Sequence, residues 1–237
     1  MPPTRRDILI AIDGPAASGK STTARLVAER LGLRYVNTGA LYRAVTWALL
    51  ARGIWPAHPE RISEFLSLLD LELQESPMGL RVLIDSQDVT EMLQLPEVSA
   101  HVSAVSALPE VRSWLLQIER ALGAEGGVVF EGRDIGTVVF PEAELKVFLT
   151  AELAERARRR WRELRERGSL VSLEEVEAEL RNRDAQDATR TLAPLRPAPD
   201  AKLLDTTLLS VAEQVERIVQ WAEEARRARQ AVPASGG

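Results

Sequence analysis

The segment Gly14–Ser21 constrains the fold of this chain more than any other feature of the sequence. It reads Gly-Pro-Ala-Ala-Ser-Gly-Lys-Ser and matches the pattern Gly-x-x-x-x-Gly-Lys-Ser/Thr, in which the backbone N–H groups of a tight loop surround phosphate groups. The apolar run Ile8–Ile12 before it predicts a short buried strand, and residues Thr22–Leu31 after it predict a helix. A strand, a glycine-rich turn and a helix N-terminus together form a phosphate cradle, so the sequence predicts a site for a nucleoside triphosphate.

The residue types of this loop suit the chemistry of a bound triphosphate. Gly14 and Gly19 permit backbone angles that a side chain would forbid, so successive N–H groups can face one anion. Lys20 supplies a positive charge for the β- and γ-phosphates, and the Ser21 hydroxyl can ligate Mg²⁺. We therefore expect the nucleotide to contact Gly14, Pro15, Ala16, Ala17, Ser18, Gly19, Lys20, Ser21 and Thr22.

Composition argues against several other classes of site. The 237 residues include no cysteine, which excludes disulfides, thiolate catalysis and cysteine–zinc sites. His58 and His101 are the only histidines, so neither a histidine metal site nor a Ser-His-Asp hydrolase is expected. The net charge of −5 argues against a broad nucleic-acid surface. No apolar run is long enough to span a membrane, and the first residues lack a signal-peptide core, so we expect a cytoplasmic protein with no membrane partner.

The outer parts of the chain alternate short apolar runs with helical patterns. The predicted strands are Ile8–Asp13, Leu33–Val36, Val128–Phe130, Leu145–Leu149 and Lys202–Leu204. The predicted helices besides Thr22–Leu31 are Gly39–Arg52, Leu108–Leu122, Ala151–Arg167, Leu173–Gln186 and Ser210–Arg229. Apolar strands that alternate with helices indicate an α/β fold, here with a five-stranded parallel sheet flanked by helices.

This alternation breaks in the middle of the chain. Leu71–Gln74 and Leu80–Ile84 look like two strands joined around Ser76-Pro77-Met78-Gly79, which is a turn signal. We expect residues 57–107 to form a small inserted substrate subdomain, with residues 1–56 and 108–237 as the core. The Ala/Pro/Ser/Gly-rich residues 231–237 are expected to form a disordered tail.

A second candidate site is the segment Thr38–Arg43, directly after the second predicted strand. Thr38 is a suitable helix N-cap, Gly39 allows close approach of another molecule, and Arg43 lies one turn into the helix. Ligands bind at the carboxyl edge of open α/β sheets, where Arg43 could reach an anion. The alternative is a capped helix with a solvated arginine, and the segment alone does not decide between them.

A third candidate is the segment Glu131–Thr137, which follows the predicted strand Val128–Phe130. An acidic residue at the end of a strand beside the phosphate-loop strand is well placed to hold Mg²⁺-bound water, and Glu131 has that position. Arg133 and Asp134 lie between two glycines on the loop that follows. A simple turn would also contain such residues, but a loop at the end of a buried strand favours function.

Two arginine-rich segments complete the candidates. Arg183, Asp187 and Arg190 have helical spacing and could hold a phosphate and sugar hydroxyls, although a surface ion pair is the commoner outcome. Arg156, Arg159 and Arg160 share a helix face that could form a lid over the triphosphate. Interspersed glutamates equally fit a solvated helix with ion pairs.

These segments, in this order, resemble the bacterial cytidylate kinase family over about residues 7–225. The stretch Gly132–Pro141, which reads Gly-Arg-Asp-Ile-Gly-Thr-Val-Val-Phe-Pro, is especially specific, and Ala193–Leu195 also fits. The resemblance implies a nucleoside monophosphate kinase of the P-loop NTPase fold. Its expected parts are a parallel core sheet, an inserted monophosphate-binding subdomain that contains β-strands, and a short lid at about residues 151–170.

The resemblance also assigns roles to residues that match the family motifs. CMP would contact Thr38, Arg43, Ser103, Arg112, Arg133, Asp134, Arg183, Asp187 and Arg190. ATP would contact the phosphate loop and the lid residues Arg156, Arg159 and Arg160. The catalytic residues would be Lys20, Arg133, Asp134 and Arg183, with Mg²⁺ held by Ser21 and, through water, by Glu131. The chain departs from the family where Asn37-Thr38 replaces the commoner Asp-Ser and where Glu131 replaces an aspartate.

The activity implied is transfer of the γ-phosphoryl group of ATP to CMP or dCMP, by a monomer that needs Mg²⁺. A first alternative is another small P-loop kinase that acts on UMP or a different monophosphate, since the phosphate loop and the arginines fit any of these. A second alternative is a regulatory P-loop nucleotide-binding protein. The GTPase motifs Asn-Lys-x-Asp and Asp-x-x-Gly are absent from the sequence, which counts against a GTPase.

Overall fold

The computed structural model describes residues 7–76 and 79–231, which divide by their contacts into two compact units. The first contains the described chain up to Val36 and from Leu122 onward, and the second contains Asn37–Ala121. The insertion expected at residues 57–107 falls within the second unit, which also includes residues 37–56 and 108–121. Its function as a monophosphate-binding subdomain stays a prediction.

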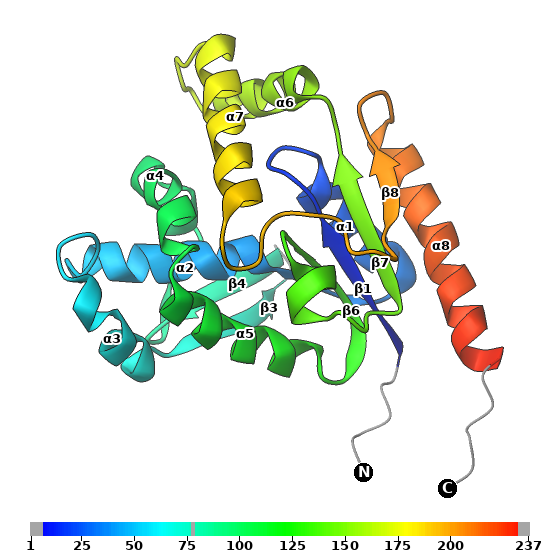
Figure 1. Ribbon diagram of the computed structural model, residues 1–237, viewed down its shortest axis with the longest axis horizontal. Coiled ribbons are helices and arrows are strands. Elements are labelled where there is room, and N and C mark those ends of the chain that lie inside the picture. The colour runs from blue at the N-terminus through cyan, green and yellow to red at the C-terminus, as the bar shows by residue number, and fades with distance from the viewer. Residues whose placement is uncertain (1–6, 77–78, 232–237) are drawn as a thin grey trace, which may run out of the picture. The chain divides into compact units, whose positions relative to one another are not determined.

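The first unit is built on the five-stranded parallel sheet that the sequence predicts. The strands are β1 (Asp7–Asp13), β2 (Arg34–Asn37), β6 (Gly126–Gly132), β7 (Leu145–Thr150) and β8 (Lys202–Asp205), in the order β2-β6-β1-β7-β8. β1 is the central strand, between β6 and β7 (Figure 1). Residues Ile8–Ile12 are fully buried, as their continuous apolar run predicts. This sheet, with its glycine loop after β1, is that of the P-loop NTPase fold.

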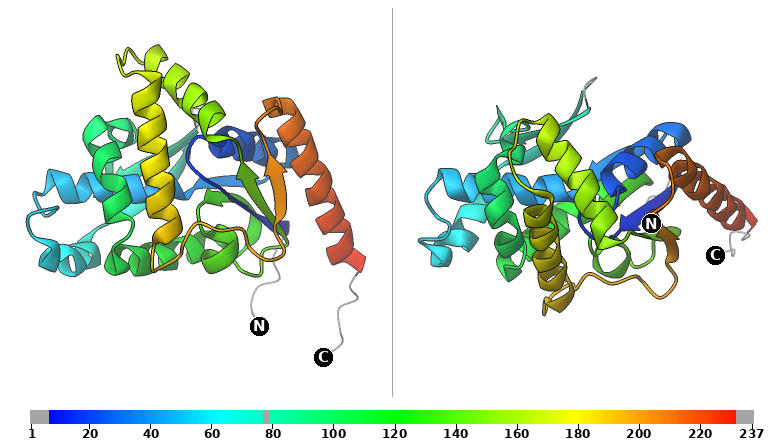
Figure 2. Two further views of the ribbon diagram at one scale, coloured as in Figure 1. Left: turned by 45° about the horizontal axis from the view of Figure 1, so that its top comes forward. Right: turned by 90° about the horizontal axis from the view of Figure 1, so that it is seen from above.

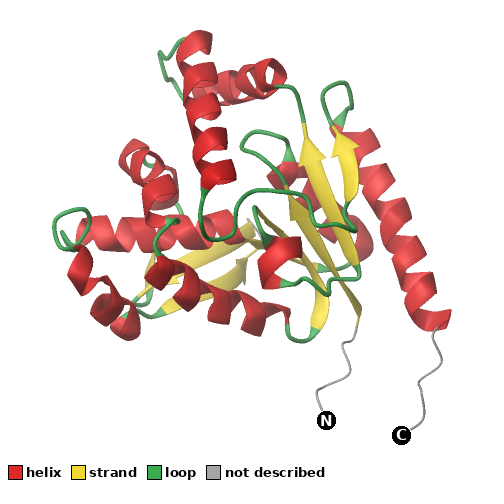
Figure 3. Cartoon of the chain, viewed as in Figure 1, coloured by secondary structure: helices red, strands yellow, loops and turns green. Residues whose placement is uncertain are grey.

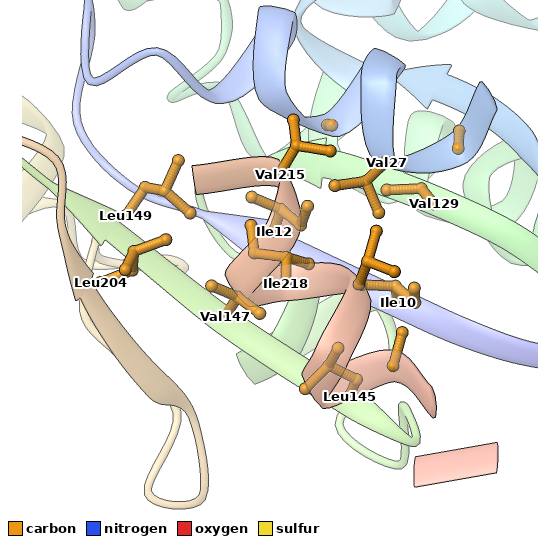
Figure 4. Packing of buried hydrophobic residues seen from close by; sticks show 14 of the residues in the cluster. Ile10, Ile12, Val27, Val129, Leu145, Val147, Leu149, Leu204, Val215 and Ile218 are labelled. Carbon is orange, nitrogen blue, oxygen red and sulfur yellow. The ribbon is translucent and has the colours of Figure 1, made fainter. Parts of the chain in front are cut away.

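Two helices of the first unit, α1 (Lys20–Leu31) and α8 (Val211–Ala231), pack against the sheet and against each other. Ile10 and Ile12 from β1 meet Val27 from α1 and Val215 and Ile218 from α8 in one apolar cluster (Figure 4). This packing fixes the start of α1 relative to the end of β1, between which the phosphate loop lies. The expected tail at 231–237 is outside the described residues except for Ala231, which ends α8.

The helices α6 (Leu153–Glu166) and α7 (Leu173–Thr189) form a hairpin whose members lie side by side in both views of Figure 2. Ser172 begins α7 with a capping box, in which its hydroxyl accepts from the backbone N–H of Glu175 and its own N–H donates to the Glu175 carboxylate. Ala157, Val176 and Leu180 of the hairpin pack with Ala16 of the phosphate loop. The region in which the sequence places a lid therefore contacts the nucleotide loop directly.

The second unit consists mainly of helices with a small antiparallel sheet, visible in Figure 3. The strands are β3 (Leu71–Ser76), β4 (Gly79–Ile84) and β5 (Gln87–Asp88), paired in the order β3-β4-β5. The helices are α2 (Thr38–Ala51), α3 (Ile62–Leu68), α4 (Pro96–Val105) and α5 (Pro109–Gly123), with short 3₁₀ turns η1 (Pro59–Arg61) and η2 (Met92–Gln94). The predicted hairpin is confirmed, while Pro77 and Met78 of its predicted turn lie outside the described residues.

The predicted helices and strands agree with the structure to within three residues at each end. Several elements have no counterpart among the predicted ranges. In the second unit these are η1, α3, β5, η2 and α4. In the first unit it is a π-helical turn, η3 (Ile135–Val139), directly after the segment that contains Arg133 and Asp134. Among the described residues, no helix combines the length and the apolar character that crossing a membrane requires.

Candidate active site

The phosphate loop connects the end of β1 to the N-terminus of α1. Gly14 has φ +151°, and a Cβ atom on it would lie 2.0 Å from the carbonyl oxygen of Leu149 on β7. Gly19 has φ +91° and is the N-cap residue of α1, so the capping position has no side chain that could bond the first N–H groups of that helix. Uncapped N–H groups and the positive end of the helix dipole together suit an anion.

Lys20, the first residue of α1, is buried to 5% exposure, and its Nζ donates to the carbonyl oxygen of Pro15 at 2.7 Å. Burial lowers the pKa of Lys20 to about 7, and the positive charge of Arg133 adds to this shift. Glu131 and Asp13 oppose the shift, and Arg183 adds to it further. The arginines that the sequence assigned to catalysis are thus near enough to Lys20 to act on its charge. A bound phosphate would restore the ammonium form.

The hydroxyl and carboxylate groups predicted to hold Mg²⁺ are oxygen donors, which this ion prefers. Ser21 is exposed in the first turn of α1, as is Thr22. Glu131 on β6 is 3% exposed and accepts a hydrogen bond from the Tyr35 hydroxyl at 2.8 Å. The described residues contain no group of three histidines, cysteines or carboxylates that would bind a metal alone. Mg²⁺ in nucleotide sites takes much of its coordination from phosphates and water, so Ser21 and Glu131 fit the ion.

Arg133, Asp187 and Arg190 form one charged cluster, which joins residues of two separate sequence motifs. Arg133 Nε donates to Asp187 Oδ2 at 3.0 Å, and Arg190 Nη2 donates to Asp187 Oδ1. Asp187 is 1% exposed, so its charge is held between two guanidinium groups away from water. Arg183 and Asp187 lie on α7, which ends at Thr189. Arg190 therefore binds Asp187 from the position just after that helix.

Asp134 is buried and precedes the π-helical turn η3 as its N-cap residue. Its backbone oxygen accepts from the N–H of Val138 at 2.9 Å, but its side chain makes no capping hydrogen bond. Asp13 on β1 performs that function instead. Its two carboxylate oxygens accept from the N–H groups of Ile135 and Gly136, each at 2.8 Å.

The arginines on α6 differ in what they contact. Arg156 is 6% exposed and donates to Asp184 Oδ2 at 2.7 Å and to the carbonyl oxygen of Ala16 at 3.3 Å. Arg159 donates to the hydroxyl and the carbonyl of Thr206, at 3.0 and 2.6 Å. Arg160 pairs with Glu163. Arg156 therefore binds the backbone of the phosphate loop, at the Ala16 carbonyl. Arg160 makes the intrahelical ion pair that the spacing of the glutamates suggested.

The remaining predicted residues lie in the second unit. Arg43 on α2 donates through Nη1 to the Leu93 carbonyl at 3.0 Å and the Ser99 hydroxyl at 2.9 Å. Arg112 on α5 donates to the carbonyl oxygen of Ser106 at 3.2 Å, and its guanidinium carbon lies 5.7 Å from the Tyr42 ring centroid. Ser103 is half-buried on α4, and its carbonyl oxygen accepts from the Ser106 hydroxyl.

The prediction that Thr38 caps α2 is wrong. The N-cap is Asn37, whose backbone is extended and whose side-chain oxygen accepts from the N–H of Ala40 at 3.1 Å. Thr38 is the first helical residue and is buried to 3% exposure. Asparagine and threonine are both good N-cap residues, so the sequence placed the start of the helix one residue too late.

Several residues that support the site belong to no sequence motif. Thr206, fully buried after β8, donates to the Ser18 carbonyl at 3.0 Å and so holds the phosphate loop. Asp13, Asp184 and Ser99 likewise act through other residues and have no local signature. The sequence offers one hint for Asp13, because a charged residue that ends an otherwise apolar strand needs a buried partner.

Residues 10–224 match the model of a known family, cytidylate kinase. A bifunctional pantoate ligase/cytidylate kinase from Synechococcus sp. (strain JA-3-3Ab) is 50% identical over 222 residues, which cover 92% of this chain and 41% of that protein. Cytidylate kinases from Carboxydothermus hydrogenoformans and Thermotoga neapolitana are 49% and 47% identical, over 89% and 92% of this chain and 95% and 98% of their own lengths.

Among solved structures, an uncharacterized protein from Eubacterium ventriosum ATCC 27560 aligns over 92% of this chain and 99% of its own, with a TM-score of 0.51 and 11% identity. That likeness concerns the fold alone. This chain spans only 41% of the length of the bifunctional relative, but it spans nearly the whole of the relatives named cytidylate kinase. From the family match and these relatives, the chain belongs to the cytidylate kinase family.

Proposed function

We propose that this chain transfers the γ-phosphoryl group of ATP to the 5′-phosphate of CMP or dCMP, which yields ADP and CDP or dCDP. The observation that carries the proposal is the buried Lys20 of a P-loop, with Arg133 and Arg183 close enough to shift its pKa. Several cations gathered at one phosphate cradle suit a reaction between two phosphorylated substrates. The family match supports cytosine as the base of the acceptor.

The acceptor in this reaction is already an ionised phosphate, so no general base is needed. Catalysis then depends on alignment of donor and acceptor and on neutralisation of the charge that develops during transfer. Lys20, Arg133 and Arg183 would supply positive charge, and Asp134 would help to orient the acceptor. Mg²⁺, held by Ser21 and through water by Glu131, would neutralise charge on the β- and γ-phosphates.

For the acceptor nucleotide, we propose the contacts that the family motifs assign. Thr38, Ser103, Arg112 and Asp134 would recognise the base, and Arg43 would bind the phosphate. The contacts to phosphate and ribose would be completed by Arg133, Arg183, Asp187 and Arg190. The buried Arg133–Asp187 pair supports this, because it fixes a guanidinium that would otherwise sample many positions.

We further propose that residues 151–170, which contain α6, act as the lid over ATP, with Arg159 and Arg160 on the face that meets the nucleotide. Arg156 would act on ATP through the phosphate loop, since its guanidinium already binds the Ala16 carbonyl. Closure would exclude water, which otherwise competes as an acceptor. The chain would function as a monomer in the cytoplasm, where its donor ATP is available.

An assay of ADP release with CMP, dCMP, UMP, AMP and GMP as acceptors tests the proposal. We expect kcat/KM to be highest for CMP and dCMP, and ADP release without an acceptor to be negligible. Preference for AMP or GMP would contradict the assignment of the base. Tight ATP binding without acceptor-dependent turnover would instead favour a regulatory nucleotide-binding protein.

A further inference from the structure

Asp13 is a buried carboxylate that no sequence motif and none of the roles above explains. It is the last residue of β1, directly before Gly14 of the phosphate loop, and it is 4% exposed. In the sheet it pairs in register with Gly132 of β6 on one side and Phe148 of β7 on the other. It therefore lies at the centre of the sheet's carboxyl edge, between the phosphate loop and the loop of Arg133.

Both oxygens of Asp13 are occupied by the backbone of that second loop. Oδ1 accepts from the N–H of Ile135 and Oδ2 accepts from the N–H of Gly136, each at 2.8 Å. These N–H groups begin the turn η3, where a helical turn has no internal acceptors for them. A carboxylate 122 residues away thus caps a turn that its own N-cap residue, Asp134, leaves uncapped.

The backbone of this loop at Gly136 also lies close to the side chains of Asp13 and Lys146. A Cβ atom added to Gly136 would lie 3.4 Å from Asp13 Oδ2 and 3.2 Å from Cγ of Lys146. Lys146 on β7 is buried, and its Nζ pairs with Asp200 at 2.8 Å, so the stem of Lys146 is held under the loop. A side chain at position 136 would press on the Lys146 stem and on Asp13, so the loop lies directly against β1 and β7.

The chemistry of the contact requires a carboxylate. An asparagine has one acceptor oxygen, and its NH₂ group would face the second N–H donor. Burial raises the pKa of Asp13 to about 7, but the two N–H groups and the charge of Lys20 oppose this rise. The ionised form, with two acceptor oxygens, is the one that matches the observed hydrogen bonds.

We propose that Asp13 is a positioning residue that fixes the loop of Arg133 and Asp134 to the strand that leads into the phosphate loop. Gly14 is its neighbour in sequence, and Arg133 is two residues from the Ile135 amide that it holds. Asp13 would thereby set the distance between the donor cradle and the two loop residues assigned to the acceptor. This role rests on the proposed function, but the contact itself can be tested independently of activity.

The test compares Asp13→Asn with Asp7→Asn, the same change at the other end of β1. Asp7 pairs with Arg226 and lies away from the phosphate loop, so its variant reports only on general stability. Amide hydrogen exchange at Ile135 and Gly136, followed by NMR, should become at least about tenfold faster in Asp13→Asn alone. In the same variant KM for CMP should rise about tenfold, while Kd for ATP stays within about twofold.

Three results would overturn the proposal: unchanged exchange at residues 135 and 136, an unchanged KM for CMP, or equal weakening of ATP and CMP. If Asp13→Asn does not fold, Gly136→Ala is used, because its added Cβ would press on Lys146 and on Asp13 Oδ2 and is expected to shift the loop while it leaves the carboxylate intact. We expect the same selective rise in KM for CMP from it, and unaltered kinetics would count against the proposal. If the unmodified protein fails to phosphorylate CMP, the proposed function is refuted, and the exchange rates still decide whether Asp13 holds the loop.

Discussion

Arg133 Nε donates to Asp187 Oδ2 at 3.0 Å, which joins the loop after β6 to the last turn of α7. The two residues are 54 positions apart, and the Asp187 side chain is 2% exposed. Arg190 binds the other oxygen of the same carboxylate. One buried negative charge therefore holds two arginines that the sequence assigned to the acceptor phosphate.

Replacing Asp187 with alanine should leave two guanidinium groups together without their shared anion. We expect the free energy of unfolding to fall by about 3 kcal/mol, measured by urea denaturation, because breaking one side of a buried pair costs this much. The matched control is Glu177→Ala on the same helix, whose partner Arg181 is exposed. That pair contributes at most about 1 kcal/mol. Equal losses from the two variants would show that Asp187 is an ordinary surface charge.

Gly14 should tolerate no side chain. In Gly14→Ala the new Cβ would lie 2.0 Å from the Leu149 carbonyl oxygen, which belongs to the neighbouring strand and cannot rotate away. We expect a loss of about 3 kcal/mol or more in thermal or urea unfolding. Gly32→Ala provides the comparison, because φ is +65° there but nothing lies within 4 Å of the added atom. It should cost only about 1 kcal/mol, from backbone strain.

Nucleotide binding should be coupled to proton uptake by Lys20. Its pKa is lowered from 10.5 to about 7 in the protein without nucleotide, so the side chain is mostly neutral between these values. A triphosphate favours the ammonium form, so binding at about pH 8.5 should take up close to one proton, and ATP affinity should fall as pH rises above about 7. Calorimetry in buffers of different ionisation enthalpy measures the uptake.

Lys20→Arg is the control for this proton, since a guanidinium stays charged in both states. We expect the uptake to disappear in that variant. If it persists unchanged, the proton belongs to another group, of which Asp13 is the nearest candidate, because its own pKa is raised to about 7 by burial.

Ser99 should affect acceptor binding through Arg43. The Ser99 hydroxyl accepts from Arg43 Nη1 at 2.9 Å, beside the Leu93 carbonyl that accepts from the same nitrogen. Loss of one of these acceptors in Ser99→Ala should raise KM for CMP about fivefold, with kcat within about twofold. Ser67→Ala removes a hydroxyl from an exposed position on α3 and should change neither value. An unaltered KM for CMP in Ser99→Ala would mean that Arg43 does not depend on this contact.

The sheet and its helices could be predicted because their signals are local. The buried run Ile8–Ile12, the helical spacing after Lys20 and the turn between β3 and β4 each depend on a few neighbouring residues. The phosphate loop could be predicted equally well, because its glycines are needed where the backbone leaves no room for a side chain, as at Gly14. For Arg133, Asp187 and Arg190, the motifs named the residues, but the hydrogen bonds between them required the fold.

The supporting residues could not be predicted, because each acts on a partner far away in sequence. Asp13 caps a turn 122 residues later, and Thr206 holds a carbonyl 188 residues earlier. The error at Thr38 has a different cause. Two adjacent residues, Asn37 and Thr38, are both suitable caps, and only the backbone angles decide where α2 begins.

Transfer of the phosphoryl group from ATP to CMP can be followed with a radioactive label. ATP labelled at its γ-phosphate is incubated with CMP, and the products are separated and counted. We expect the label in the β-phosphate of CDP, with Lys20→Ala folding normally but reducing the rate by about 10²–10³. Label found only in inorganic phosphate, or label transferred to AMP in preference to CMP, would refute the proposed cytidylate kinase activity.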